Sequence, residues 1–300
     1  MIGTTHDGND IAIDAGKLIG THLAIVGNTG SGKTYTVRKV LEQTWGAALH
    51  IVIDPEGEFH TLRQAHPYVI VGGPRSKMKV TPKNVANLAH DILKGQMSVV
   101  LQFEDAQHLE IQRRIIAGLI DALMAAPRAL WQPVFIVLDE AHRYAPQDGG
   151  AASRASIHTL MSQGRKRGFT GILATQRLAK ISKSAVSECN TWLIGRVGQV
   201  LDRNAAANNL GFPLKSDEAL GLRTLNPGQF WGFGVAISKL PVLIQVAATD
   251  TQHLQLGESW EDDLQSGAAP IAVPGAPKVG VAAVPLIAVV ICLALVRFLF

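Results

Sequence analysis

The stretch that decides the fold is Gly27-Asn28-Thr29-Gly30-Ser31-Gly32-Lys33-Thr34, which fits the pattern G-x-x-x-x-G-K-[ST] at every fixed position. A short apolar segment, Leu23–Val26, precedes it, and a helical segment follows from Lys33. Glycines allow a tight turn whose N–H groups face phosphates, and the N-terminus of a helix adds a partial positive charge there. The pattern therefore predicts a strand, a phosphate-binding loop and a helix in direct succession.

Two side chains of this loop have specific expected roles. Lys33 should reach the β- and γ-phosphates of a nucleoside triphosphate, and the Thr34 hydroxyl should ligate Mg²⁺. The alternative is an accidental glycine-rich turn. The eight positions in frame and the correct flanking segments argue against that alternative.

A second motif occupies Val134–His142, where five apolar residues lead to Asp139 and Glu140. Asp139 ends a predicted buried strand, which places its carboxylate at the sheet edge where it can hold Mg²⁺ through water. Glu140 suits a general base that orients and deprotonates the attacking water. A solvated acidic turn is the alternative, and the preceding apolar run disfavours it. A carboxylate at this position indicates a hydrolytic motor.

Three further residues are candidates for the chemistry. Gln176 follows the predicted strand Gly171–Thr175, and we expect it between the phosphate loop and Asp139 as a γ-phosphate sensor; otherwise it is a surface glutamine. Arg165 could act as an arginine finger in a neighbouring subunit, or merely complement a helix dipole in solvent. Arg203 is a second candidate for the finger.

Short apolar segments alternate with helical segments through residues 1–256, which predicts one α/β domain with a mainly parallel sheet and helices on both faces. The expected strands are Leu23–Val26, Leu49–Asp54, Ser98–Phe103, Val134–Asp139, Gly171–Thr175 and Trp192–Val197. The expected helices are Thr34–Trp45, Thr81–Lys94, Leu109–Ala125 and Ser153–Arg167. Residues 199–246 are less regular and are interpreted as a peripheral extension.

The composition excludes several classes. The chain has 300 residues, of which 47% are hydrophobic and 17% charged, so it is neither disordered nor fibrous. Its net charge, 28 − 24 = +4, permits a nucleic-acid partner without requiring one. Cys189 and Cys292 match no metal-binding spacing and fit a reducing compartment.

The C-terminal part differs in composition. Residues 257–278 are rich in Pro, Gly and Ala and are predicted to form a linker. The uncharged stretch Val279–Val296 spans about 27 Å as a helix, close to the hydrocarbon thickness of a bilayer. Residues 279–300 are therefore predicted to be a transmembrane anchor for a cytoplasmic domain; an apolar helix that packs on protein is the alternative.

Five pieces of this sequence, in family order, resemble the HerA/FtsK superfamily of DNA-pumping ATPases, and most closely HerA-type (DUF87-like) proteins. They are Gly27–Thr34, Asp54-Pro55-Glu56-Gly57-Glu58-Phe59, Leu138–His142, Gly164–Arg167 and Ala174-Thr175-Gln176-Arg177. The phosphate loop is shared by many families, whereas the second and fifth pieces are much more specific. The resemblance covers about residues 18–240.

This resemblance implies a RecA-like, additional-strand P-loop core that forms a hexameric ring, hydrolyses ATP with Mg²⁺ at subunit interfaces and threads DNA through its channel. For the residues named above it implies the same roles, and it favours Arg165 over Arg203 as the finger. HerA proteins usually carry an N-terminal β-barrel, but only 26 residues precede Gly27 here. A core without the barrel resembles the genome-packaging ATPases of membrane-containing viruses.

Three function classes remain open. The first is a DNA-translocating ATPase, with DNA, further copies of itself and a nuclease or capsid as partners. The second is a membrane-anchored assembly or secretion ATPase that acts on protein, which the apolar tail favours. The third is a nucleotide-switched binding module, against which Glu140 argues because a switch needs no strong water activator. We favour the first.

Overall fold

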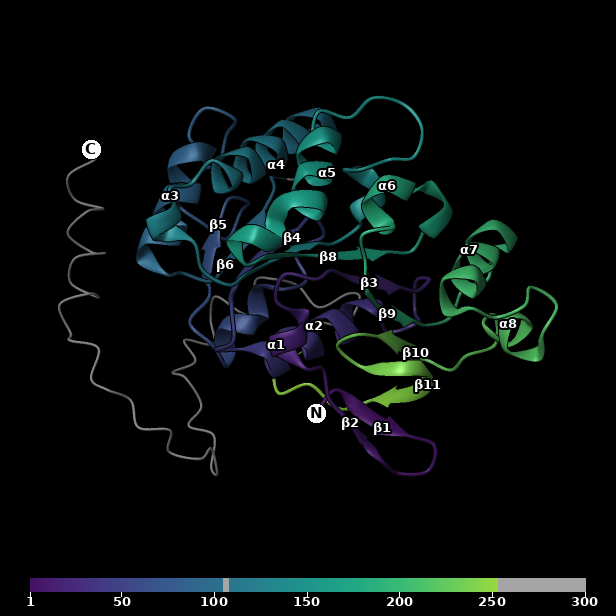
Figure 1. The fold of residues 1–300 in the computed structure, drawn as a ribbon. Coiled ribbons are helices and arrows are strands. Elements are labelled where there is room, and N and C mark those ends of the chain that lie inside the picture. The colour runs from purple at the N-terminus through teal and green to yellow at the C-terminus, as the bar shows by residue number, and fades with distance from the viewer. Residues whose placement is uncertain (105–107, 253–300) are drawn as a thin grey trace. The chain divides into compact units, whose positions relative to one another are not determined.

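The structure is a computed structural model that describes residues 1–104 and 108–252 (Figure 1). The strands are β1 (Gly3–Thr5), β2 (Asp10–Ile11), β3 (Leu23–Val26), β4 (Leu49–Asp54), β5 (Val69–Val71), β6 (Val99–Gln102), β7 (Val134–Leu138), β8 (Phe169–Thr175), β9 (Thr191–Ile194), β10 (Gln229–Gly234) and β11 (Ser238–Val246). The α-helices are α1 (Ala15–Leu18), α2 (Lys33–Thr44), α3 (Val85–Gly95), α4 (Leu109–Met124), α5 (Arg154–Gln163), α6 (Lys183–Val186), α7 (Val200–Leu210) and α8 (Asp217–Gly221). Short 3-10 turns are η1 (His60–Gln64), η2 (Arg128–Leu130), η3 (Ala141–Arg143), η4 (Gly164–Arg167) and η5 (Leu178–Lys180).

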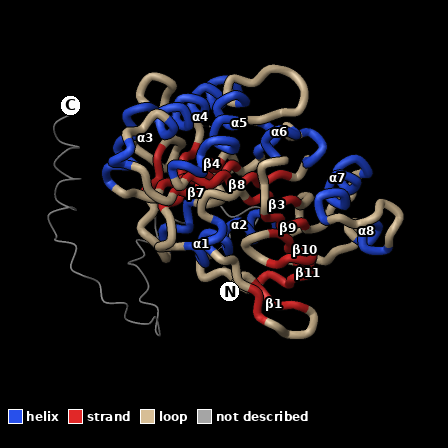
Figure 2. Tube along the Cα trace, in the orientation of Figure 1, coloured by secondary structure: helices blue, strands red, loops and turns tan. Residues whose placement is uncertain are grey.

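The described strands form a single sheet in the order β2-β1-β11-β10-β9-β3-β8-β7-β4-β6-β5 (Figure 2). From β9 to β5 every neighbouring pair is parallel, which confirms the predicted mainly parallel sheet. Strand β8 lies between β3 and β7, as expected from the position of its sequence after the Asp-Glu motif. The carboxyl ends of these three strands therefore lie side by side at one edge of the sheet.

Helices cover both faces of the sheet because successive strand residues point to opposite sides. In β3, Ala24 and Val26 pack with residues of α3, α4 and α5, whereas Leu23 and Ile25 pack with residues of α2. Figure 1 shows α3 to α6 on one side of the sheet and α1 and α2 on the other. All four residues of β3 are buried, as expected for a strand covered on both faces.

The interpretation of residues 199–246 as a peripheral extension was wrong. Strands β10 and β11 continue the sheet, because β10 pairs antiparallel with β9 and β11 pairs with β1 near the N-terminus. Of the helices and strands within residues 199–246, only the helices α7 and α8 lie outside the sheet (Figure 1). Two glycines, Gly232 and Gly234, and Pro241 dilute the strand pattern in this region, and the β10–β11 register shifts between the two glycines.

The predicted helix Ser153–Arg167 is shorter than expected. The α-helix α5 ends at Gln163, and the basic residues that follow form the 3-10 turn η4. Gly168 then takes a left-handed conformation, with φ of 81°, and directs the chain into β8.

The segment 249–252 returns to α2 after the last strand. The Thr249 and Asp250 backbone N–H groups donate to Tyr35 Oη at 2.7 Å and to Glu42 Oε2 at 2.9 Å. Glu42 Oε1 also accepts from the backbone N–H and the hydroxyl of Thr251, at 2.9 and 2.6 Å. The fully buried Arg38 donates to the same hydroxyl at 2.9 Å. A polar cluster thus joins the segment 249–252 to α2, the helix that follows the phosphate loop.

Within the described residues, no helix combines the length and apolarity needed to cross a membrane. The predicted linker, 257–278, and the predicted anchor, 279–300, lie outside the described residues.

Candidate nucleotide-binding site

The phosphate loop connects β3 to α2 and is held from both neighbouring strands. The Gly27 N–H donates to the carbonyl of Thr175 in β8 at 3.2 Å, and the Asn28 N–H donates to the carbonyl of Arg196 after β9 at 2.8 Å. Gly30 and Gly32 have φ angles of 74° and 89°, a left-handed region that disfavours other residues. The loop shape therefore depends on glycine at both positions.

The N-terminus of α2, directly after the loop, has no side-chain cap among the described residues. Gly32 caps α2 without a side chain, and no side chain of the described residues caps the first turn. The Ser31 hydroxyl is buried and makes no hydrogen bond within the described part of the chain. Unpaired N–H groups, an unpaired hydroxyl and the helix dipole together suit the phosphates of a nucleotide. Thr34, in the first turn of α2, is partly exposed there.

Lys33 contacts both carboxylates of the second motif. Its Nζ donates to Asp139 Oδ1 and lies 3.1 Å from Glu140 Oε1. Burial alone would lower the pKa of Lys33, but Asp139 and Glu140 outweigh it and raise this pKa above its ordinary value. Lys33 therefore remains charged. The first residue of α2 thus meets two adjacent carboxylates that follow β7, although Asp139 lies 106 positions further along the chain.

Glu140 is held as a carboxylate in an unusual backbone conformation. Its φ is 50°, in the left-handed region, which turns the chain directly after Asp139. Burial would raise the pKa of Glu140, but the neighbouring His142 and Lys33 lower it to about 2. The side chain therefore carries its charge at neutral pH.

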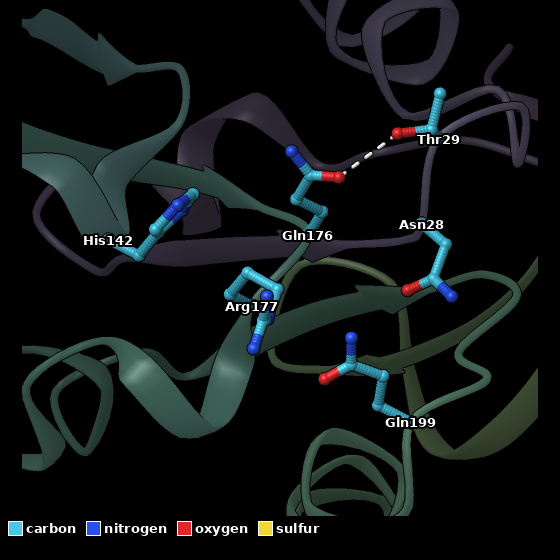
Figure 3. A pocket seen from close by; sticks show the side chains of 6 residues that line it. All are labelled: Asn28, Thr29, His142, Gln176, Arg177 and Gln199. Carbon is cyan, nitrogen blue, oxygen red and sulfur yellow. Dashed lines mark hydrogen bonds between the residues drawn. The ribbon is translucent and has the colours of Figure 1, made fainter.

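Gln176 reaches the phosphate loop from the carboxyl end of β8. Its Oε1 accepts a hydrogen bond from the Thr29 hydroxyl at 3.0 Å (Figure 3). Both residues line a pocket of about 390 Å³ beside the loop. The residues lining this pocket are Asn28, Thr29, His142, Gln176, Arg177 and Gln199.

The two finger candidates lie in different places. Arg165 belongs to η4, which precedes β8, and its side chain packs beside Gly20 ahead of β3. The phosphate loop follows β3, so Arg165 lies at the opposite end of the parallel strands. Arg203 lies in the first turn of α7, where its N–H donates to the carbonyl of the pocket residue Gln199 at 2.8 Å. The structure brings only Arg203 near the pocket of its own chain.

Three residues at the site were given no role of their own in the sequence analysis. Arg196, after β9, donates to the Gly30 carbonyl at 3.1 Å; its position at the end of the strand next to β3 was the available signal. His142 was quoted within the second motif but given no role. Asp54 accepts from the Glu58 and Phe59 N–H groups, both at 3.0 Å, and so folds its own loop.

Asp54 is a fully buried carboxyl at the end of β4, the strand next to β7. Gln102 donates to it at 2.8 Å. Burial raises the pKa of Asp54 to about 6 despite these hydrogen bonds. The loop that Asp54 folds carries Glu56, whose Oε1 accepts from Arg143 at 2.9 Å.

Comparison with known proteins supports the likeness seen in the motifs. Residues 1–145 match the family described as "Helicase HerA, central domain". The resemblance of this chain to HerA-type proteins is confirmed. Over 139 residues the HerA-like chain is 28% identical to the probable helicase MJ1565 of Methanocaldococcus jannaschii, covering 44% of this chain and 26% of that protein. Over 121 residues it is 30% identical to the DNA double-strand break repair helicase HerA of Pyrococcus furiosus, covering 39% of this chain and 21% of that protein.

These matches span about a quarter of the length of the two relatives. Solved structures resemble a larger part of the HerA-like chain. VirB4 of Thermoanaerobacter pseudethanolicus superposes with a TM-score of 0.61 at 12% identity, over 83% of this chain and 96% of VirB4. The bacterial conjugative coupling protein TrwB gives 0.58 at 8% identity, over 84% and 92% of the two chains.

The genome-packaging NTPase B204 of Sulfolobus turreted icosahedral virus 2 gives a TM-score of 0.52 at 13% identity, over 76% of this chain and 97% of B204. At such identities the likeness concerns the fold alone. It supports the α/β, RecA-like P-loop class expected from the sequence.

Proposed function

We propose that this HerA-like chain hydrolyses ATP with Mg²⁺ and uses the energy to move double-stranded DNA. The observation that carries the proposal is the meeting of Lys33, Asp139 and Glu140 beside an uncapped helix N-terminus. The match of residues 1–145 to the HerA central domain supports DNA as the substrate.

Each residue of the site has one task in this proposal. Lys33 binds the β- and γ-phosphates, which requires it to exchange its contacts with Asp139 and Glu140 for phosphate oxygens. Thr34 and Asp139 hold Mg²⁺, which when bound neutralises charge on the transferred phosphoryl group. Glu140 orients water and accepts its proton, and Gln176 contacts the γ-phosphate from the tip of β8.

The site is proposed to be completed by a neighbouring subunit. Arg165 lies at the opposite end of the strands from Lys33, so it can stabilise γ-phosphate charge only in another copy of the chain. This arrangement fits a ring, and we propose a homohexamer. The exposed Lys180 and Lys183, which follow Gln176, suit contacts with DNA phosphates. A nuclease or capsid partner and the membrane anchor remain predictions.

The test is steady-state ATP hydrolysis by the full chain with and without double-stranded DNA. We expect DNA to stimulate hydrolysis, and rising salt to weaken the stimulation because phosphate contacts release counterions. Glu140→Gln should lower kcat by about 10²–10⁴ because it removes the general base. Hydrolysis that no DNA form stimulates at low salt would contradict the DNA proposal.

Hydrolysis that DNA does not stimulate, but that Glu140→Gln still abolishes, would favour an ATPase that acts on protein. The observation behind this second candidate is the apolar stretch 279–300, which would tether the motor to a membrane. Recovery of assembly or secretion proteins with the chain, and no DNA, would support it.

A further inference from the structure

His142 lies between the proposed general base and the tip of the sensor strand. It belongs to η3, directly after Asp139 and Glu140, and its ring lines the pocket beside the phosphate loop (Figure 3). Its Nδ1 lies 3.1 Å from Thr175 Oγ1 and 3.2 Å from Glu140 Oε2. The same ring nitrogen thus faces two oxygen atoms, one on the last residue of β8 and one just beyond the end of β7.

A single N–H can form a well-aligned hydrogen bond with only one of these oxygen atoms at a time. A carboxylate oxygen at 3.2 Å favours the form of the ring that carries a proton on Nδ1, because a bare nitrogen lone pair there would be repelled. In that form of the ring the Nδ1–H donates to Thr175 Oγ1, which also accepts from the Arg177 N–H at 3.0 Å. Glu140 Oε2 is buried without a hydrogen bond among the described residues. An unpaired buried carboxylate oxygen is costly, so it will compete for this donor.

The position of Thr175 is tied to the phosphate loop. Thr175 is the last residue of β8, its carbonyl accepts from the Gly27 N–H at 3.2 Å, and the next residue is Gln176. Gln176 in turn accepts from the Thr29 hydroxyl of the loop at 3.0 Å. A phosphate that forms a hydrogen bond with Gln176 or the loop would therefore move the Thr175 hydroxyl. This hydroxyl competes with Glu140 for the hydrogen bond from His142.

We propose that His142 is a positioning residue whose Nδ1–H passes from Thr175 to Glu140 when the tip of β8 moves, so that sensing at Gln176 fixes the orientation of the general base. This inference rests on the proposed ATP hydrolysis. Held by His142 at one oxygen and facing Lys33 with the other, the Glu140 carboxylate has a single orientation toward water. Without the hold, one oxygen is free and the carboxylate can rotate.

Kinetics of the full chain provide the first test. His142→Ala should lower kcat about tenfold, the loss expected for one orienting hydrogen bond, and leave the KM for ATP within about twofold. His142→Asn, whose amide nitrogen can occupy the place of Nδ1, should restore most of kcat. His158→Ala is the matched control: His158 donates to or accepts from Ser182 Oγ at 2.7 Å, away from the site, and its loss should leave kcat unchanged.

Thr175→Val tests the competition directly, because valine keeps the branched shape but removes the competing oxygen. We expect kcat without DNA to rise about threefold in the Thr175→Val variant and not at all when His142→Ala is also present. The inference is overturned if Thr175→Val changes kcat equally with and without His142, or if it changes only KM. It is also overturned if His142→Asn is as slow as His142→Ala.

Solid-state NMR of histidine-labelled full chain gives a readout independent of turnover. The His142 Nδ1 signal, assigned by its loss in His142→Ala, should be that of a protonated nitrogen and should shift in Thr175→Val. An unprotonated Nδ1, or a signal that Thr175→Val leaves in place, overturns the inference even in an active ATPase. A shifted signal in a protein that binds but never hydrolyses ATP would support the exchange of partners and contradict the proposed function instead.

Discussion

Glu42→Ala should detach the segment 249–252 from the phosphate-loop helix. Glu42 accepts three hydrogen bonds from this segment, at 2.9, 2.9 and 2.6 Å, and its side chain is almost fully buried. Its carboxylate also compensates the charge of Arg38, which is fully buried on the same helix and whose Nε has no hydrogen bond within the described residues. The alanine variant leaves the buried Thr251 N–H without its acceptor and breaks the buried ion pair between Glu42 and Lys39, at 3.6 Å. It also removes the carboxylate that compensates the Arg38 charge, although Arg38 keeps its hydrogen bonds to the Thr251 hydroxyl and the Glu58 carbonyl.

The size of the effect follows from these contacts. Hydrogen bonds to a charged group contribute about 1.5–3 kcal/mol each, but three that share one carboxylate do not add in full. Removing one partner of a buried ion pair costs about 3–5 kcal/mol, and we expect a loss of this order. For a domain of this size that corresponds to a fall in Tm of roughly 10 °C.

Urea unfolding of the full chain at pH 7 measures this loss. Glu110→Ala is the matched control, because Glu110 is about half exposed and its ion pairs with Arg113 and Arg114 are long, at 3.6 and 3.8 Å. It should change the free energy of unfolding by less than about 0.5 kcal/mol. If Glu42→Ala falls within about 1 kcal/mol of this control, the buried cluster does not hold the segment and the reasoning is refuted.

Two further predictions concern the site. Burial raises the pKa of Asp54 to about 6, so between about pH 4 and 6 the folded protein holds a proton that the unfolded chain has released. The free energy of unfolding, measured with urea, should therefore fall by about 2–3 kcal/mol as the pH rises from 4 to 7. The Asp54→Asn variant should not show this fall. The same pH slope in both proteins would count against a buried, protonated Asp54. Gly32→Ala places a Cβ 3.2 Å from the Gly228 nitrogen at a φ of 89° and should weaken binding of a fluorescent ATP analogue at least about tenfold. Gly46→Ala is the control: it carries the same backbone strain, at a φ of 83°, but its Cβ meets no atom within 4 Å, so this variant should bind the ATP analogue normally. An equal loss of binding in both variants would mean that the effect comes from lost stability alone.

The central part of the fold could be predicted because its strands are continuous apolar runs. Strands β3 and β4 have the predicted bounds, and β7 differs from its prediction by the single residue Asp139. Burial on both faces leaves little choice of residue in such strands, so the signal is strong. The phosphate loop was equally clear, because its backbone geometry needs glycine at fixed positions.

The antiparallel half of the sheet was not predicted, and its residues explain why. Strand β11 is partly exposed along most of its length and contains Pro241, and β10 contains glycines at close approaches. Their place in the sheet is set by pairing with β9 and β1, contacts between distant segments that no local pattern records.

Within the candidate site, sequence reasoning named the two carboxylates but could not give their orientation. The motif named Asp139 and Glu140, yet it does not record the left-handed turn at Glu140. The contact of His142 Nδ1 with Thr175 depends on the position of β8, which is distant in the sequence. Likewise, the pairing of Glu42 with the segment 249–252 joins polar residues more than 200 positions apart, without periodicity.

The attachment of segment 249–252 also determines where a mechanical load acts on the domain. The described chain ends at Gln252, against η1 and α2, and α2 begins at Lys33. A pull on the chain at Gln252 is therefore delivered to a helix about 18 Å long whose other end carries the proposed phosphate-binding site. Optical-tweezer handles attached after Gln252 would load the nucleotide site directly, whereas handles on α8 would load the far edge of the domain. In such a recording, the rate of ATP turnover should depend on force only in the first geometry.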